Sequence, residues 1–92
     1  MSQDHRTILF SGRVQGVGFR ATCVDFARST DLTGTVRNLD DGRVELVVHG
    51  PVADIETLLQ RLSEHFGDFL RTVDQTPGTP SNSRNRGLRI IH

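Results

Sequence analysis

Residues 33–50, TGTVRNLDDGRVELVVHG, determine the expected fold class because they read as two strands joined by a tight turn. TGTVRN has the composition of a strand, and the NLDDG that follows carries the Asp-Gly pair typical of a β-hairpin. In RVELVVHG, the apolar side chains of Val44, Leu46 and Val48 alternate with polar ones, which is typical of a strand with one buried face. The stretch therefore predicts two antiparallel neighbouring strands.

The segment before this hairpin predicts a strand followed by a helix. TILFSG, residues 7–12, is a short apolar run that ends in glycine, which is consistent with a strand buried in a sheet. Beyond it, side chains that suit a buried face recur at spacings of three and four, which predicts a helix over residues 20–29. That face is formed by Phe19, Cys23, Phe26, Ala27 and Thr30.

The segment after the hairpin predicts a second helix. Pro51 suits the first turn of a helix, where its missing N–H leaves no hydrogen bond unmade, and Gly67 suits the end. Between them an apolar stripe follows the helical period. Its members are Val52, Ile55, Leu58, Leu59, Leu62 and Phe66.

The C-terminal part of the chain gives weaker signals. FLRTV, residues 69–73, is compatible with a strand, and LRII, residues 88–91, predicts a short closing strand. Between them DQTPGTPSNSRNRG, residues 74–87, is polar and contains two prolines and two glycines. For this segment we expect an exposed, mobile loop.

The order of these elements predicts an α+β fold, the ferredoxin-like βαββαβ sandwich, in a single domain over residues 1–92. We expect an antiparallel sheet with two helices on one face and a short extra C-terminal strand. In this arrangement the first two strands run in the same direction, and the third lies between them. Their C-terminal ends then lie at one edge of the sheet, about 10 Å apart because neighbouring strands are about 4.8 Å apart.

A glycine-rich stretch, GRVQGVGFR at residues 12–20, leaves the first strand at that edge, where Asn38 ends the second strand. Gly16 and Gly18 allow successive backbone N–H groups to turn toward one point, and the helix that begins near Arg20 adds the positive end of its dipole. The guanidinium of Arg20 is planar, permanently charged and suited to paired phosphate oxygens. The glycines alone favour a simple turn before a surface arginine, but the whole string together with Asn38 predicts an anion site.

Composition narrows the functional classes. The 11 basic residues, all arginine, balance 11 acidic ones, and the absence of lysine excludes Schiff-base chemistry and the lysine-containing phosphate loop of NTPases. A single cysteine, Cys23, excludes an intrachain disulfide framework and a CxxC pair, and the four histidines lack metal-ligand spacing. We therefore expect no metal. The balanced charge favours no nucleic-acid partner.

The start of the chain, MSQDHRTILFSG, lacks the long apolar stretch of a signal peptide, and no run approaches membrane-spanning length. We therefore expect no membrane partner and a cytoplasmic location. We also expect the chain to act as a monomer.

The glycines also match a dinucleotide-binding fingerprint, G-x-G-x-x-A, through Gly16, Gly18 and Ala21, with Asp40 near the expected acidic position. That fold needs a parallel sheet, whereas the second strand here runs directly into a hairpin. We therefore discard the dinucleotide interpretation.

Taken together, GRVQGVGFR and GTVRNLDDGRVELVVHG resemble the acylphosphatase family, the first string its phosphate-loop signature and the second its G-x-V-x-N-x-x-D-G-x-V-E segment. The similarity covers residues 6–66. It implies a ferredoxin-like fold and cofactor-independent hydrolysis of small acyl phosphates to a carboxylate and inorganic phosphate. It further implies that Arg20 binds the phosphoryl group and that Asn38 positions the attacking water. The implied phosphate-binding loop consists of Gln15, Gly16, Val17, Gly18, Phe19 and Arg20.

This chemistry suits the residues that the sequence offers. An acyl phosphate releases a carboxylate, whose conjugate acid has a pKa of about 4, so the leaving group needs no general acid. The neutral amide of Asn38 can accept a hydrogen bond from water without repelling an anionic substrate. The ring of Phe19 is expected to anchor the loop to the core rather than to touch substrate.

Three alternatives stay open at this point. The same fold and loop occur at the start of carbamoyl-transferring hydrogenase-maturation proteins, so the chain could be a non-catalytic accessory domain that binds an acyl or carbamoyl phosphate. An RNA-binding module on this fold would need stacking aromatic residues on its central strands, and the chain has no Trp or Tyr. An inactive structural domain would make the pairing of Arg20 with Asn38 a coincidence.

Overall fold

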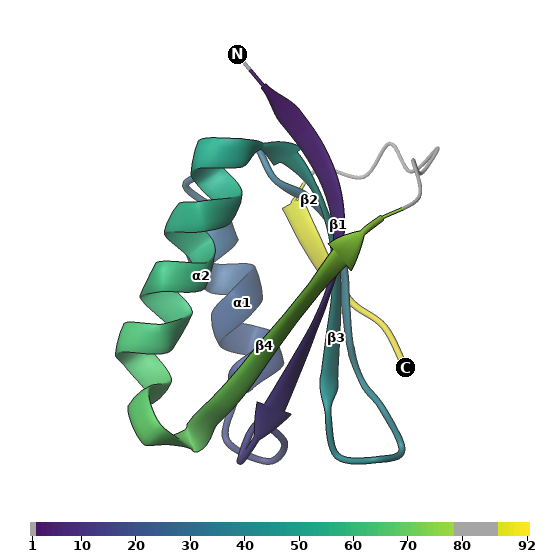
Figure 1. Cartoon of the computed structure of the whole chain (residues 1–92), viewed down its shortest axis with the longest axis vertical. Helices are drawn as coiled ribbons and strands as arrows, with labels where there is room; N and C mark the ends of the chain where they lie inside the picture. The colour runs from purple at the N-terminus through teal and green to yellow at the C-terminus, as the bar shows by residue number, and fades with distance from the viewer. Residues whose placement is uncertain (1, 79–86) are drawn as a thin grey trace.

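The computed structural model describes residues 2–78 and 87–92 and contains two layers, a sheet and a pair of helices (Figure 1). Within these residues, no helix is long and apolar enough to cross a membrane. The elements in chain order are β1 (Gln3–Gly12), α1 (Phe19–Ala27), β2 (Thr33–Asn38), β3 (Val44–Pro51), α2 (Val52–Phe66), the 3-10 turn η1 (Gly67–Phe69), β4 (Leu70–Pro77) and β5 (Gly87–Ile90).

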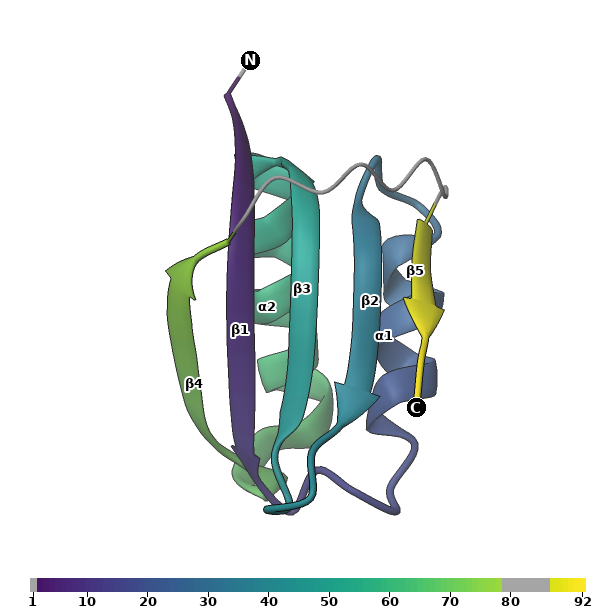
Figure 2. The same ribbon diagram turned by 90° about the vertical axis from the view of Figure 1, so that its right-hand side faces the viewer.

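The sheet has the strand order β4-β1-β3-β2-β5, and both helices cover one of its faces (Figure 2). β3 lies between β1 and β2 and is antiparallel to both, so β1 and β2 run in the same direction and end at the same edge. This confirms the predicted ferredoxin-like arrangement. The extra C-terminal strand, β5, joins β2 in parallel, which makes the five-stranded sheet mixed rather than wholly antiparallel.

The polar segment 74–87 does not begin as a loop, contrary to the sequence-based prediction. Residues 74–77 continue β4 and pair with β1 at the edge of the sheet. Their side chains are exposed, so the strand carries no apolar alternation that would identify it in the sequence. Gly87 already belongs to β5, and residues 79–86 lie outside the described residues.

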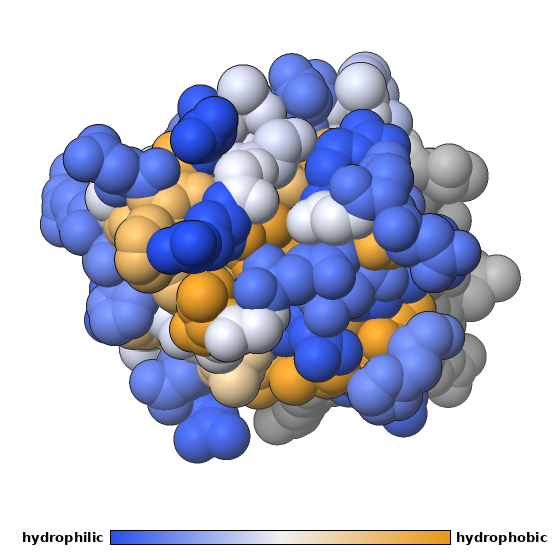
Figure 3. Space-filling model, turned by 90° about the horizontal axis from the view of Figure 1, so that it is seen from below, coloured by the Kyte–Doolittle hydropathy of each residue, from blue (hydrophilic) through white to orange (hydrophobic). Residues whose placement is uncertain are grey.

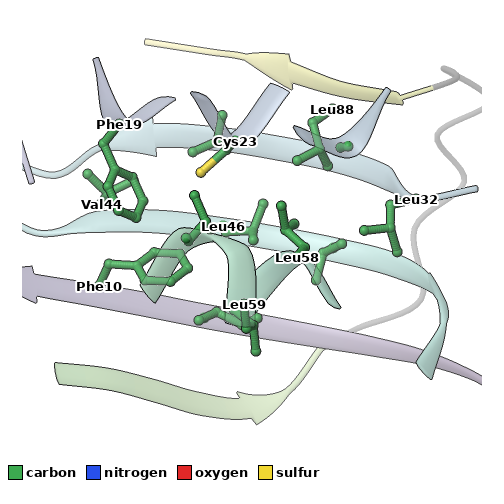
Figure 4. Packing of buried hydrophobic residues seen from close by; sticks show 14 of the residues in the cluster. Phe10, Phe19, Cys23, Leu32, Val44, Leu46, Leu58, Leu59 and Leu88 are labelled. Atoms are coloured by element: carbon green, nitrogen blue, oxygen red, sulfur yellow. The ribbon is translucent and has the colours of Figure 1, made fainter. Parts of the chain in front are cut away.

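The core lies between the sheet and the helices, and it is built from the apolar faces that the periodicities predict (Figure 4). Every second side chain of β3 is buried, and the α2 stripe packs against the sheet as a row of buried residues. The buried hydrophobic residues are Ile8, Phe10, Val14, Phe19, Cys23, Ala27, Leu32, Val36, Val44, Leu46, Val48, Ile55, Leu58, Leu59, Leu62, Phe66 and Leu88.

Phe19 connects the sheet and both helices within this core. Its ring centroid lies 4.8 Å from that of Phe10 on β1 and 4.7 Å from that of Phe66 at the end of α2. Phe19 is 1% exposed and is the first residue of α1, directly after Gly18. The C-terminal end of the glycine-rich loop is therefore fixed to the sheet and to both helices.

Replacing Phe19 by alanine is expected to lower the free energy of unfolding by about 3–5 kcal/mol, because it leaves a cavity among three packed elements. Phe69 offers a matched control, since its ring is 45% exposed. Phe69→Ala is expected to change the free energy of unfolding by less than about 1 kcal/mol. Urea unfolding followed by circular dichroism measures both. Equal losses in the two variants would contradict the role given to Phe19.

Candidate functional site

A hollow of about 140 Å³ opens at the edge of the sheet where β1 and β2 end. Figure 3 looks onto this end of the molecule, where hydrophilic residues surround small exposed apolar areas. The hollow brings together the two residues that the sequence analysis singled out for chemistry, Arg20 and Asn38. It is lined by Val14, Gly16, Gly18, Phe19, Arg20, Ala21, Asn38 and Ile90.

Two glycines shape the loop that forms one wall of the hollow. Gly16 has φ 77° and Gly18 has φ 79°, both in the left-handed region. A β-carbon at either position would meet no atom within 4 Å, so glycine is needed for its backbone conformation rather than for space. This conformation carries the chain from the end of β1 to the start of α1.

The backbone of the loop offers hydrogen-bond donors. Among the residues that the structure describes, no backbone N–H from Gln15 to Gly18 donates to a protein acceptor. The first N–H groups of α1 also lack partners within the helix, as in any α-helix. The loop and the helix start therefore present N–H groups and the positive end of a helix dipole to the same region, a combination that suits an anion.

Arg20 projects from the first turn of α1 and makes no ion pair within the described parts of the chain. By contrast, Arg28, Arg37 and Arg43 each lie within 4.0 Å of a carboxylate. The guanidinium of Arg20 therefore keeps its donors available for an anionic ligand in the hollow.

Asn38 is the last residue of β2, and its side chain contains an unpaired acceptor. Its Oδ1 atom is buried and has no hydrogen-bond partner among the described residues. A buried polar atom without a partner costs about 1–3 kcal/mol, and such atoms are rare in folded proteins. An amide oxygen held in this way beside the hollow can accept a hydrogen bond from a molecule bound there.

The side chain of Gln15 holds the loop against the turn between β2 and β3. Its Nε2 donates to the carbonyl oxygens of Leu39, at 2.8 Å, and Arg43, at 3.0 Å. The Leu39 N–H also donates to the Arg43 carbonyl at 2.8 Å and closes the turn. The two hydrogen bonds of the Gln15 side chain, which we call the Gln15 clamp, thus connect the loop to the residue that follows Asn38. Because the side chain is engaged in this way, any contact of Gln15 with a ligand would come from its backbone N–H.

The structure separates the residues of the predicted phosphate loop into two groups. Gly16, Gly18 and Arg20 line the hollow, and Phe19 lies at its floor with a buried ring. Val17 is half-buried against the core and, like Gln15, does not line the hollow.

Three lining residues were missed by the sequence analysis, namely Val14, Ala21 and Ile90. Val14 and Ala21 were missed because they lie just outside the predicted loop, which covers residues 15–20. Ile90 comes from β5, and no sequence signal indicated that this strand pairs in parallel with β2.

The thiol of Cys23 and the placement of possible metal-ligating side chains also bear on the chemistry of the site. Cys23 is completely buried, and burial raises the pKa of its thiol to about 12, so it cannot serve as a nucleophile at neutral pH. Over residues 2–78 and 87–92, no group of three or more His, Cys, Asp or Glu side chains is placed to hold a metal ion.

Comparisons with known proteins identify the family. A family model described as acylphosphatase matches residues 6–86. Acylphosphatase 2 of Ralstonia nicotianae is 43% identical over 83 residues, which cover 89% of this chain and 85% of that protein. The acylphosphatase of Haloarcula marismortui is 48% identical over 60 residues, which cover 65% of this chain and 66% of that protein.

Solved structures show the same fold along the whole chain. The crystal structure of acylphosphatase from Bacillus subtilis superposes with a TM-score of 0.84 at 28% identity and covers 99% of this chain and 100% of that one. An acylphosphatase from Coxiella burnetii gives a TM-score of 0.83 at 30% identity, with 97% and 93% covered. The chain therefore belongs to the acylphosphatase family and is a hydrolase of that class.

Removal of the Gln15 clamp is expected to destabilise the protein. Gln15→Ala removes two hydrogen bonds to backbone carbonyls and should lower the free energy of unfolding by about 1–3 kcal/mol. Gln60 is the control, because its Nε2 bonds only to the exposed Glu64 carboxylate, so Gln60→Ala should stay within about 0.5 kcal/mol of wild type. Urea titration of both variants decides the matter. The clamp is dispensable if the two curves coincide.

The buried thiol is expected to resist alkylation in the folded protein. At pH 8 the raised pKa keeps Cys23 as the thiol, and its burial denies access to iodoacetamide. Mass spectrometry should find native protein labelled at least about 100-fold more slowly than protein unfolded in urea, which serves as the control. Rapid, complete labelling of the native protein would show that Cys23 is accessible.

Proposed function

We propose that this protein hydrolyses the carboxyl–phosphate bond of small acyl phosphates, with the phosphate held by residues 15–20 and the attacking water positioned by Asn38. One observation carries the proposal: Arg20, which has no carboxylate partner among the described residues, and Asn38, whose buried amide oxygen has no hydrogen-bond partner among them, line the same hollow. Membership of the acylphosphatase family supports it.

The binding step relies on charge and on preorganised donors. The backbone N–H groups of residues 15–18 and of the first turn of α1 donate hydrogen bonds to the equatorial phosphate oxygens. The guanidinium of Arg20 binds two of these oxygens and neutralises part of their charge. These donors stand ready before the substrate arrives, so little reorganisation is needed as charge develops in the transition state.

The chemical step needs only the bound water and the substrate. Asn38 Oδ1 accepts a hydrogen bond from the water, whose oxygen attacks phosphorus in line with the leaving group. The bond between phosphorus and the acyl oxygen breaks, and its electron pair departs with the carboxylate. The proton of the water moves to a phosphoryl oxygen. The products are one carboxylate and one inorganic phosphate, and no side chain has to act as a general acid because the conjugate acid of the leaving group has a pKa of about 4.

This sequence of steps uses groups from one chain alone. We therefore propose that turnover is independent of metals and cofactors and that a monomer suffices. A cytoplasmic location would give access to small acyl phosphates, and inorganic phosphate would act as a product inhibitor.

A second function is a non-catalytic accessory domain that binds an acyl or carbamoyl phosphate. Its support is structural: full-length HypF in a phosphate- and nucleotide-bound form matches this chain with a TM-score of 0.83 at 22% identity over 12% of its length, which shows a shared fold alone. Such a domain would bind phosphate through the same loop without turning substrate over.

The two functions are separated by an assay of benzoyl phosphate hydrolysis with a chelator present. Arg20→Ala and Asn38→Ala are each expected to lower kcat/KM by at least about 10²–10³, because each removes a preorganised group from the transition state. Asn38→Asp should lose activity as well, since it places a negative charge beside the anionic substrate. Arg28→Ala is the matched control: Arg28 follows the same helix, is exposed and should leave the rate within twofold of wild type.

Circular dichroism must show that each variant is folded. Turnover that vanishes in the site variants and persists in Arg28→Ala supports the enzyme. A folded wild type that binds inorganic phosphate but does not hydrolyse benzoyl phosphate would favour the accessory domain and contradict the proposed hydrolysis.

A further inference from the structure

Ile90 lies in the hollow beside the residues assigned to phosphate and water, yet the proposed reaction gives it no role. It is 40% exposed and is one of two large hydrophobic residues with exposed side chains in the described part of the chain. The other, Phe69, does not line this hollow. At the rim of a polar site, this apolar side chain is available to contact the apolar part of a ligand.

The parallel pairing of β5 with β2 fixes the position of Ile90. Ile90 is the register partner of Val36, and the Ile91 N–H donates to the Val36 carbonyl at 3.0 Å. Ile90 therefore lies on the strand beside β2, opposite the residue that comes two positions before Asn38. With a strand spacing of about 4.8 Å and a rise of about 3.3 Å per residue, the two Cα atoms are about 8 Å apart, so Ile90 and Asn38 lie on neighbouring strands at the same edge of the sheet.

The walls of the hollow can be divided by what each can bind. The loop N–H groups and Arg20 bind phosphoryl oxygens, and Asn38 binds the water. In-line displacement places the leaving acyl group on the side of phosphorus away from that water. Val14 and Phe19 are each 1% exposed, so the accessible apolar surface that remains is Ala21 and Ile90.

From this division we infer that Ile90, together with Ala21, forms the wall that contacts the acyl group and selects acyl phosphates with an uncharged alkyl or aryl group. The inference rests on the proposed function. Among the lining residues that the structure describes, Arg20 is the one charged side chain, and it is assigned to the phosphoryl group, so none of the others can bind a second carboxylate on the substrate. Carbamoyl phosphate presents a polar amide in place of the alkyl group, so contact with this wall does not strengthen its binding.

The size of the hollow predicts that the contact is partial. At about 140 Å³ it holds a phosphate and little more, so an acyl chain must extend across the rim where Ile90 is exposed. Full burial of a methylene would strengthen binding by about fourfold, so an exposed rim should give about twofold for each added methylene.

Binding of 2-oxoalkylphosphonates tests this selection apart from catalysis, because a methylene replaces the bridging oxygen and the compounds cannot be hydrolysed at that position. Calorimetry of the propyl, butyl and pentyl members should show wild-type affinity rising about twofold per methylene. In Ile90→Ala the factor by which affinity rises for each methylene should fall from about two to nearly one. The affinity for inorganic phosphate should stay within twofold of wild type. Phe69→Ala, the other exposed apolar residue, should keep the full increment.

Each result is decisive. If Ile90→Ala keeps the chain-length increment, or if the wild type shows none, Ile90 does not contact the acyl group and the inference is wrong. An equal loss of the increment in Phe69→Ala would also overturn it. If the increment depends on Ile90 but benzoyl phosphate is not hydrolysed, the inference stands and the proposed hydrolase function fails.

Discussion

The packing of Phe19 between Phe10 and Phe66 is the interaction on which the site depends. It unites the sheet with both helices at the residue where the glycine-rich loop becomes α1. Val14, near the other end of the loop, is also buried. The loop therefore spans two anchors in the core and is tied to the hairpin turn by Gln15. A loop held at three points can keep its N–H groups oriented without a ligand, which is what preorganised binding of an anion requires.

The site is less well satisfied than the core that supports it. Asn38 keeps a buried oxygen without a partner, and Gly16 and Gly18 hold left-handed backbone conformations. Arg20 is left without a carboxylate among the residues described. In the proposed function, a bound phosphate and water supply the partners that Arg20 and Asn38 lack, so ligand binding restores local stability at these two residues. The continuous hydrophobic core supplies the stability that permits this.

Much of the fold follows from periodicity. Alternation in the strand around Leu46 and the stripe of α2 identified elements that the structure confirms, because their burial leaves a pattern in the sequence. The predicted topology placed Arg20 and Asn38 at one edge of the sheet, and both residues line the same hollow, whereas the roles that the resemblance implies for them stay predictions. Residues 74–77 were missed because a polar edge strand carries no such pattern. The Gln15 clamp and the place of β5 were missed because they depend on contacts between distant parts of the chain, which no local pattern records.

The central claim is that residues 15–20 form the phosphate-binding site. It is tested most directly by titrating inorganic phosphate into ¹⁵N-labelled protein and following the amide resonances. The geometry predicts saturable shifts concentrated in the backbone amides of residues 15–21 and in the side-chain amide of Asn38. Saturable shifts centred elsewhere, for example around Arg13 and Arg71 at the hollow beside β4, would contradict the claim, as would the absence of any saturable shift.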